Sequence, residues 1–500
     1  MKTHLERRRA RRLVQRGQAM PFALVFLVVG AAALYLAFNA AQLAHAKTKE
    51  QDTADSAAFS VGVLQARDLN FAAYTNRAMV ANQVAAAQMA SIKSYVDELA
   101  GTYKNTHGFD FFIESTALTA EATWTLPKQG GSAVLNVAKS ALDTATRIAT
   151  VAIDGLDKVL STEQAAFHDS MLLQIPVVAE EVAQANESNS HATKTYFATR
   201  GALALNSTLN FAKRNTPAGQ TGKDRFADVV TDKTTLDQFV QQRGPNIRDP
   251  FVASIVEECP GFSAIVADNN HRGGTQLRPD KRGWESLDAT DVNGFWICYF
   301  EVGVAGGPII GDAGSGGAAN GPGGSYSGTQ GYGGYDNFGG ALTSALTRIA
   351  ATDQYDKGPG RSLSSSNGGL QPYLELSTLK TPADGDDFNR APAITVEVQR
   401  ASSSIRTTDQ LHIANGRLQV TDGTANNQMR SVASASAYFI RPADSSAGVA
   451  GALNNLTHWK RDDNKWEYPS LFSPYWQSSL VATNMAALEA ADLAQSAGAP

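Results

Sequence analysis

The stretch QAMPFALVFLVVGAAALYLAFNAAQLAHA, residues 18–46, contains no Asp, Glu, Lys or Arg, and it determines where the rest of the chain lies. About 20 apolar residues are enough to cross a hydrocarbon core of roughly 30 Å. These 29 residues therefore predict one membrane-spanning helix. We expect the span itself near Phe22–Ala40, and we expect the helix to continue outward beyond it.

The seventeen residues before this stretch carry seven basic side chains and one acidic side chain, Glu6. Basic flanking segments remain on the cytoplasmic side of a membrane helix. We therefore expect a single-pass protein of the inner membrane, with a cytoplasmic N-terminus and with the bulk of the chain in the periplasm or outside the cell. The basic residues are Lys2, Arg7, Arg8, Arg9, Arg11, Arg12 and Arg16.

A secretory signal peptide is the alternative interpretation of this N-terminus, because Ala44-His45-Ala46 imitates a small-residue cleavage site. The apolar core of such a peptide is about 7–15 residues long, which is shorter than the core of this chain. We therefore favour a permanent anchor, and release after Ala46 remains the alternative.

The junction Arg16-Gly17-Gln18-Ala19-Met20 resembles the processing site of type IV prepilins and of the Tad/Flp pilus-assembly proteins TadE and TadG. The resemblance implies cleavage between Gly17 and Gln18. Phe22 stands where those prepilins usually carry Glu.

The segment that follows, and above all the element ADSAA at residues 54–58, is also similar to TadE/TadG-like proteins, over about the first 95 residues. The resemblance implies a non-catalytic structural protein of the bacterial envelope, either a minor pilin-like subunit or an assembly anchor. Its expected partners are the membrane and other pilus or secretion-system subunits.

The composition limits the other partners. The whole chain carries a net charge of −5, and since the first seventeen residues carry +6, the remainder carries −11. An acidic exported part argues against nucleic-acid binding, which requires a basic face. Five hundred residues, 43% of them apolar, are sufficient for two or three domains with hydrophobic cores.

Only two cysteines occur, Cys259 and Cys298. Both lie in the part that we expect to be exported, where a disulfide can form and persist. We predict that they pair. Two buried thiols are the alternative.

Two helical regions should follow the membrane span. Residues 47–99 contain no proline and predict a helix from the bilayer to about Leu99. Within it, the polar residues of Tyr74–Gln83 form either a solvated face or hydrogen bonds between packed helices or subunits. The second region, Ser132–Lys213, should break or kink at Pro176, with further helical pieces at Val178–Ala185 and Tyr196–Phe211.

The second region contains an apolar stripe with nearly heptad spacing, which predicts an amphipathic helix with this stripe buried. Its members are Val134, Ala138, Ala141, Ala145, Ile148, Ala152, Leu156 and Val159.

Beyond Asn215 the composition changes, and strands are expected at Gly294–Val304 and Ile394–Val398, with weaker candidates at Arg417–Val420 and Ser434–Ile440. Residues 303–340 contain 16 glycines and predict a mobile loop that is dispensable for folding. The aromatic and proline-rich segment 466–477 predicts a buried strap, with an exposed binding patch as the alternative, and an Ala-rich helix should follow at Ser478–Gln495.

The expected fold class is thus α+β, with a single transmembrane helix that continues into an elongated helical stalk and a distal head that contains β-structure. The expected domains are a basic leader (1–17), the transmembrane helix (18–46), the helical stalk (47–213), an α+β or mainly β head (214–475) with the Gly-rich loop (303–340), and a C-terminal helix (476–500).

No motif in the chain predicts catalysis. Ser377-Thr378-Leu379-Lys380 fits the S-x-x-K pattern of serine acyl enzymes, but its companion motifs are missing. The Gly-rich tract lacks the G-K-[ST] of a phosphate loop. The acidic clusters Asp384–Asp387 and Asp462–Asn464 lack EF-hand spacing and are more typical of solvated turns than of calcium sites. We expect no enzyme activity, no cofactor and no metal.

In lipid, helices associate through small residues and through polar groups that find partners. Gly30, Ala33, Ala37 and Asn39 therefore predict a packing face for self-association or for docking on another helix; a plain anchor is the alternative. The alternative function for the whole chain is a surface adhesin or ligand-binding module with one transmembrane anchor.

Overall fold

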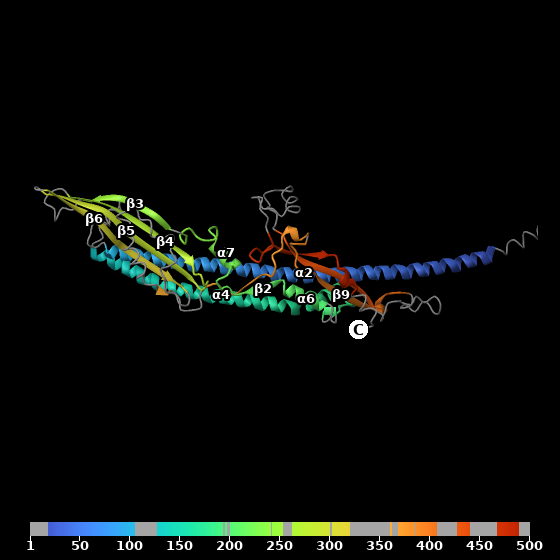
Figure 1. Ribbon diagram of the computed structural model, residues 1–500. Coiled ribbons are helices and arrows are strands. Elements are labelled where there is room, and N and C mark those ends of the chain that lie inside the picture. Colours follow the sequence, from blue (N-terminus) through green and yellow to red (C-terminus); the bar gives the residue numbers. More distant parts are fainter. Residues whose placement is uncertain are drawn as a thin grey trace, which may run out of the picture. The chain divides into compact units, whose positions relative to one another are not determined.

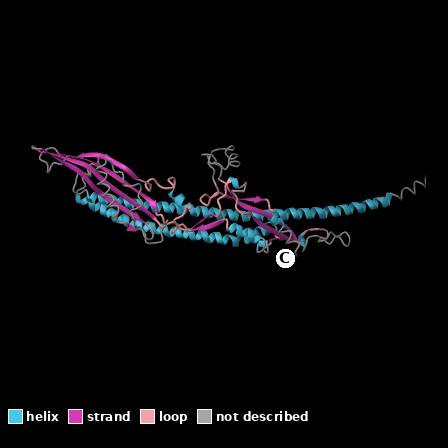
Figure 2. Ribbon diagram, viewed as in Figure 1, coloured by secondary structure: helices cyan, strands magenta, loops and turns pink. Residues whose placement is uncertain are grey.

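The computed structural model describes residues 19–105, 128–193, 196–197, 201–241, 243–253, 263–300, 303–320, 361–362, 369–385, 387–407, 428–440 and 468–489. Helices and strands are mixed in this part of the chain (Figures 1 and 2). The chain forms two compact units: unit 1 comprises residues 1–71, 166–213 and 375–500, and unit 2 comprises residues 72–165 and 214–374. The expected division into stalk and head remains a prediction.

Helix α2 (Ala19–Asn105) is 87 residues long. The sequence contains no proline from Phe22 to Asn105, so no backbone N–H is missing from the helical ladder in that range. The prediction that the membrane helix continues without interruption is confirmed, and the helix ends six residues beyond the expected Leu99.

Helix α4 (Lys128–Asn186) is 59 residues long and contains Pro176 in its interior. Of the break or kink expected at Pro176, the break is therefore wrong, and Val178–Ala185 is part of α4 rather than a separate piece. The helix continues because the turns on both sides of Pro176 are held by burial, with Met171, Ile175 and Ala179 each at most 1% exposed. Of the expected piece Tyr196–Phe211, the structure has α6 (Gly201–Leu209).

The predicted buried stripe of α4 is wrong, and the two faces are reversed. Ile148, Leu156 and Val159 are exposed. The buried positions between residues 146 and 164 are all polar, and they recur at spacings of three and four: Thr146, Thr150, Asp154, Asp157, Ser161 and Gln164. The apolar residues do form a stripe along α4, but in this part of the helix the polar stripe is the buried one.

Unit 2 contains a five-stranded sheet in the order β3-β4-β5-β6-β7. Strands β3 (Arg243–Ala253), β4 (Ser263–Leu277), β5 (Trp284–Phe300) and β6 (Gly303–Ala319) are antiparallel neighbours, and β6 pairs in parallel with the short β7 (Arg361–Ser362). Figure 1 shows β3–β6 running beside one another. Helix α7 (Arg225–Thr231) precedes the sheet, and Asp224 caps it by accepting a hydrogen bond of 2.9 Å from the Ala227 N–H.

Strand β6 corrects the prediction of a loop over residues 303–340. Residues 303–319 pair with β5 along its length, with one register shift near Thr290. Backbone hydrogen bonds do not require side chains, so a glycine-rich segment can form a strand when its neighbour supplies the ladder. Gly316 is needed there because an added Cβ would overlap the backbone of Ser94 and Glu98 on α2. The rest of the tract, residues 321–340, lies outside the described residues. The expected strand Gly294–Val304 is split between the end of β5 and the start of β6.

Unit 1 contains a four-stranded antiparallel sheet in the order β1-β9-β10-β11. The strands are β1 (Ser190–Ala192), β9 (Ile394–Ala401), β10 (Gln428–Phe439) and β11 (Trp476–Val481). Strands β9 and β10 confirm two expected strands, and Arg417–Val420 lies outside the described residues. A separate two-stranded sheet joins β2 (Ala212–Asn215) to β8 (Tyr373–Leu376).

Strand β11 corrects the prediction of a C-terminal helix that starts at residue 476 or 478. Residues 476–481 pair with 439–434 of β10, and only residues 485–489 are helical in the described part of the C-terminal segment. The aromatic strap ends at Trp476, which is 3% exposed and packs edge-on against Phe439 at 5.4 Å. The backbone of Trp476 exchanges two hydrogen bonds with the Asn70 side chain of α2, at 2.8 and 3.0 Å. This strap therefore holds a strand, not a helix, against α2.

The core of unit 1 lies between α2, α4 and the sheet. Three alanines, with Val61 and Leu64, supply its α2 contribution, and the small alanine side chains allow the sheet and a second helix to approach closely. Ala54, Ala57 and Ala58 are fully buried against Ile175 of α4 and Val396 of β9, among others.

Candidate functional site: the uncovered end of helix α2

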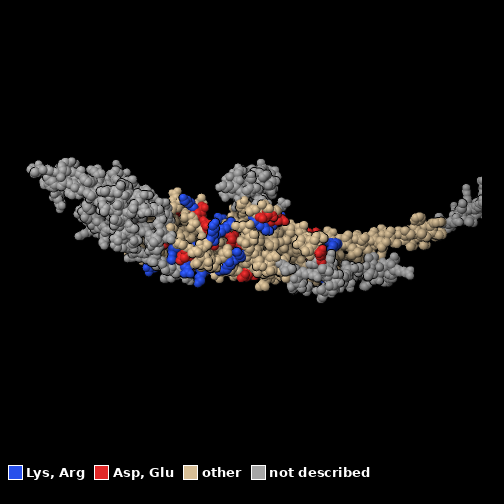
Figure 3. Space-filling model, in the orientation of Figure 1, with Lys and Arg blue, Asp and Glu red and all other residues tan. Residues whose placement is uncertain are grey.

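The first part of α2 is not covered by the protein. The large apolar side chains between Met20 and Phe38 are exposed, except for the half-buried Tyr35. Figure 3 shows the described start of α2 without a charged residue. Among the described residues, α2 is the one helix that is long and apolar enough to cross a membrane.

Beyond Phe38 the rest of unit 1 covers one side of the helix, while Ala40, Ala41 and Ala44 remain exposed. Asn39 is 2% exposed, and Leu43 and Ala46 pack against Ile405 and Met429. The 19 residues from Met20 to Phe38 extend about 28 Å at 1.5 Å per residue. This length matches a hydrocarbon core of about 30 Å. The coarse prediction of one N-terminal helix with the properties of a membrane span is therefore confirmed, and the uncovered segment ends at Phe38.

The predicted packing face divides into two parts. Gly30, Ala33 and Ala37 are exposed, and a Cβ added to Gly30 would meet nothing within 4 Å. Asn39 is buried by the rest of the chain and lies nine residues from Gly30, about 180° away around the helix. Asn39 therefore does not belong to the exposed surface, and association through Gly30, Ala33 and Ala37 remains a prediction.

The other predicted site residues are outside the described part of the chain or are described only in part. Gly17 and Gln18 lie outside it, so the processing site remains a prediction. Cys298 lies in β5 opposite Ser263, but Cys259 is not described, and the disulfide also remains a prediction.

A charged cluster around the buried Glu50 follows the uncovered segment on α2. Lys47 donates to the Arg430 carbonyl at 2.8 Å, and Lys49 forms an ion pair with Glu187. Glu50 is fully buried and accepts a hydrogen bond of 2.6 Å from Ser190. Burial raises the pKa of Glu50. The hydrogen bond from Ser190 and the positive charges of Arg400 and Lys47 offset part of that rise. Such a cluster fixes α2 against the sheet by directional contacts.

In unit 2 the contact between α2 and α4 is also polar. Asp157 of α4 accepts hydrogen bonds from Asn82 at 2.8 Å and from Gln83 at 2.7 Å. Gln164 donates to Thr75 at 2.6 Å and to Asn76 at 2.8 Å. Of the two interpretations of Tyr74–Gln83, hydrogen bonding between packed helices is therefore correct for Thr75, Asn76, Asn82 and Gln83.

Ion pairs extend this polar contact toward the end of α2. Lys93 is 1% exposed, and it pairs with Asp97 and, at 2.6 Å, with Asp143 of α4. Lys139 of α4 lies 3.2 Å from Asp97. On the sheet side of α2, Ser94 donates to Asp288 at 2.6 Å and Ser91 lies 2.5 Å from Thr275. We call the buried and half-buried polar residues that bond α2 to α4 the polar seam: Thr75, Asn76, Asn82, Gln83, Lys93, Asp97, Asp143, Asp157 and Gln164.

The sequence contained the signal for the polar seam. Residues 143, 146, 150, 154, 157, 161, 164 and 168 are polar at helical spacing, but an apolar stripe at equal spacing competes with them.

Two groups resemble parts of catalytic sites but are engaged in structural bonds. His168 lies 2.7 Å from Asp68 and 3.2 Å from the Leu209 carbonyl, so both ring nitrogens face acceptors and no nitrogen points to a nucleophile. Ser377 donates to the Asn210 carbonyl, and residues 377–380 are not helical.

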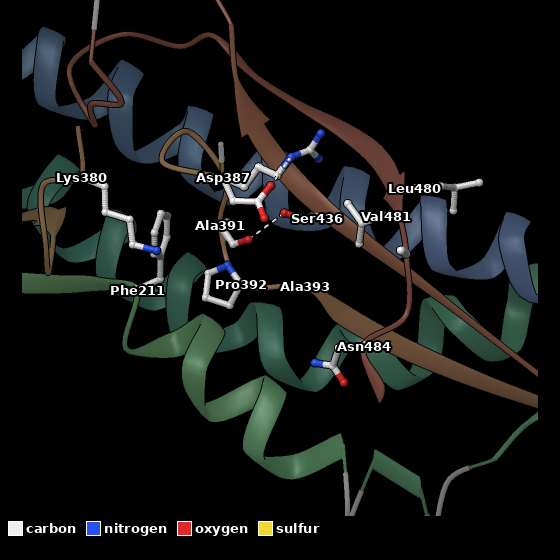
Figure 4. Close-up of a pocket in the computed structure, with 12 residues that line it drawn as sticks. Phe211, Lys380, Asp387, Ala391, Pro392, Ala393, Ser436, Leu480, Val481 and Asn484 are labelled. Atoms are coloured by element: carbon white, nitrogen blue, oxygen red, sulfur yellow. Dashed lines mark hydrogen bonds and ion pairs between the residues drawn. The ribbon is translucent and has the colours of Figure 1, made fainter. Parts of the chain in front are cut away.

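A groove of about 750 Å³ opens beside β11 in unit 1 (Figure 4). Several of its polar groups are bound to other protein groups: Arg390 pairs with Asp387 at 3.2 Å and donates to Ser479 at 2.8 Å, and Ser436 donates to the Ala391 carbonyl at 2.7 Å. In the part of the chain that the structure describes, no three His, Cys, Asp or Glu side chains are placed to hold a metal.

Comparisons with known proteins add no assignment: no family model matches the chain, and searches of curated proteins and of solved structures found no significant similarity.

Proposed function

We propose that this chain is a membrane-anchored structural protein of the bacterial envelope. The observation that carries the proposal is the 19-residue uncovered apolar start of α2, which passes without a break into a folded unit. Exposing so many large apolar side chains to water is unfavourable, whereas lipid is a suitable environment for them. The basic residues before position 18 favour a cytoplasmic N-terminus with the folded units on the other side.

The finer proposal is a role in Tad or type IV pilus-like assembly, as a minor pilin-like subunit or an assembly anchor. It rests on the resemblance of residues 16–20 and 54–58 to TadE/TadG-like proteins. The burial of Ala54, Ala57 and Ala58 explains why this segment needs small residues, but the role itself rests on the resemblance. A non-catalytic role also agrees with the structural bonds of His168 and Ser377.

Membrane extraction tests the anchoring. The wild-type chain should remain in the membrane fraction after alkaline carbonate washing, whereas Leu27→Arg should shift part of it to the soluble or degraded fraction. Arg at the centre of a span costs about 2.5–3.5 kcal/mol of insertion free energy. Val63→Arg, on the same helix beyond the uncovered segment, is the matched control. Extraction of the wild-type chain by carbonate would contradict a spanning helix.

Affinity purification from membranes tests the assembly role. Stable co-purification with pilus or secretion subunits would support it. Binding to a purified glycan or host protein, in the absence of such subunits, would favour the alternative of an adhesin or ligand-binding module. The groove beside β11 is the observation that favours this alternative.

A further inference from the structure

Lys93 of α2 lies inside unit 2, between two carboxylates. Its side chain is 1% exposed, and its ammonium group forms ion pairs with Asp97, one turn further along α2, and with Asp143 of α4. The distance from the Lys93 Nζ to the Asp143 Oδ1 is 2.6 Å. An amine and a carboxyl group from two different helices are therefore held in direct contact.

The lysine side of this contact is shielded from water. Asp97 and Ser94 are buried beside Lys93, while Asp143 is half-buried. The ion pair of Lys49 in unit 1 is more open, because the Lys49 side chain is 47% exposed. A buried lysine–carboxylate pair lacks the hydration that stabilises its two charges in water.

A second lysine keeps the charges of this site in balance. Lys139 of α4 lies 3.2 Å from the Asp97 Oδ1. If Lys93 and Asp143 lose their charges together, one cation and one anion disappear, and Lys139 with Asp97 remains as a complete ion pair. The buried Glu98 follows Asp97 in the chain and is not needed for this balance. The four groups are therefore balanced both with and without the charges of Lys93 and Asp143.

We propose that Lys93 and Asp143 condense to an amide bond, which links α2 and α4 covalently within unit 2. The bond is an isopeptide between two side chains of one chain. It requires no co-reactant, since the reactants are a lysine amine and an aspartate carboxyl group, and one water molecule is released.

The reaction conserves atoms, charge and electrons. The Lys93 ammonium gives one proton to the Asp143 carboxylate, which yields an amine and a carboxylic acid. The Nζ lone pair then attacks the Asp143 Cγ and forms the C–N bond. Asp97 accepts a proton from the nitrogen and passes it to the departing hydroxyl group, so the C–O bond breaks and water leaves. Asp97 is a carboxylate at the start and at the end.

Two features favour condensation over hydrolysis. Groups that are held in the right geometry react as if at an effective concentration of about 10⁵–10⁸ M. Burial also favours the amide, because an amide needs less hydration than the ion pair that it replaces. The bond crosses from α2 to α4, so it fixes the two helices at one position along the polar seam.

Intact mass spectrometry of the full chain, purified in detergent and then reduced and denatured, tests the proposal. After correction for the substitution, the wild-type chain should be lighter than Lys93→Arg by one water molecule, about 18 Da. Arginine keeps the positive charge but does not lose its proton, so it does not attack the carboxyl group. Both chains share any processing of the N-terminus, which therefore cancels. Lys49→Arg is the matched control and should keep the water loss.

Proteolytic digestion of the wild-type chain locates the bond without any variant. We expect a branched peptide that joins residue 93 to residue 143. Asp97→Asn should lower the linked fraction of newly synthesised chain at least tenfold, because an amide does not accept the proton from Nζ. Asp387→Asn, at an exposed carboxylate, should leave the linked fraction within twofold.

A wild-type chain without the water loss would overturn the proposal and leave an ordinary buried ion-pair network. A bond from Lys93 to Asp97 would equally overturn it, because that bond lies within one helix. An unchanged linked fraction in Asp97→Asn would overturn the role of Asp97. The proposal does not depend on membrane anchoring, which carbonate extraction tests separately.

Discussion

The carboxylate of Asp157 accepts a hydrogen bond of 2.7 Å from the side-chain amide of Gln83, inside the contact between α4 and α2. This carboxylate is 1% exposed and has no cationic partner among the groups that determine its pKa. Burial raises the pKa of Asp157 from 3.8 to about 7, the amides of Asn82 and Gln83 offset part of this rise, and the charge of Asp154 adds to it.

The raised pKa predicts that the protein loses stability as the pH rises from about 4 to about 7. In this window the folded chain holds a proton on Asp157 that the unfolded chain has lost, so the free energy of unfolding falls with pH. The full difference corresponds to about 4 kcal/mol. Asp157→Asn should flatten this dependence and make the chain more stable than wild type at pH 8.

Urea unfolding of the solubilised full chain at pH 5, 6.5 and 8 measures this effect. Asp387→Asn is the control, because that carboxylate is 86% exposed. Equal pH slopes for wild type and Asp157→Asn would contradict a buried protonated carboxyl.

His168 provides a second pH prediction, in unit 1. Burial by itself lowers the pKa of His168. The hydrogen bond to Asp68, the negative charge of Asp68 and the hydrogen bond to the Leu209 carbonyl together outweigh burial, so the pKa of His168 is raised. The raised pKa means that protonated His168 stabilises the folded chain. This stabilisation is fully present at pH values below the pKa of histidine in the unfolded chain, near 6.5, and it is lost as the pH rises through the pKa in the folded chain. His168→Gln should therefore destabilise the chain by about 1–3 kcal/mol at pH 5.5 and by less at pH 9.

Thermal unfolding at the two pH values checks this prediction. His191→Gln is the control, since the imidazole of His191 is 53% exposed. A cost for His168→Gln that is larger at pH 9 would show that the neutral imidazole is the bonded form.

Gly316 tests the close approach of β6 to α2. Gly316→Ala should cost about 1–3 kcal/mol, because the new methyl group overlaps the backbone of Ser94 and Glu98, which cannot move independently of the helix. Gly317→Ala is the matched control, since its Cβ would meet the nearest atoms at 3.7 and 3.8 Å, which is ordinary contact. Equal midpoints in urea for the two variants would mean that β6 does not lie against α2.

The exposed small residues of the membrane segment lead to the fourth prediction. Replacing Gly30 and Ala33 by Ile keeps the segment apolar but blocks close helix approach, so crosslinking between membrane helices should fall. Val25→Ile/Val28→Ile, on the other side of the helix, should not reduce it. If the Gly30→Ile/Ala33→Ile variant assembles normally, the helix is a plain anchor.

The sequence predicted the long helix for a simple physical reason. An apolar run without charges, followed by residues without proline, permits few conformations other than a helix, and α2 follows this pattern to Asn105. Strand β9 was equally accessible, because its alternation of side chains is local, whereas the residues of β10 were only a weaker strand candidate.

The elements that were predicted wrongly depend on contacts with residues far away in the sequence, which a local sequence pattern does not contain. Residues 303–319 form β6 because β5 pairs with them, and residues 476–481 form β11 because β10 does. The inward face of α4 was missed because Asp157 and Gln164 are buried only when Asn82, Gln83 and Thr75 are present to bond them. The candidate site was predicted as far as the apolar span, but the covering of α2 beyond it depends on remote residues, since Ile405 and Met429 pack against Leu43 and Ala46.

The polar seam has a mechanical consequence. Two helices joined by leucines can slide past each other by one turn and recover most of their contact, since one apolar side chain replaces another. Amides and carboxylates do not have this freedom, because a shift of 5.4 Å would leave Asp157, Gln164 and Lys93 buried without partners. Sliding of α2 along α4 is therefore opposed by discrete bonds that must all break together. The relative position of the two helices along their length is fixed by these bonds.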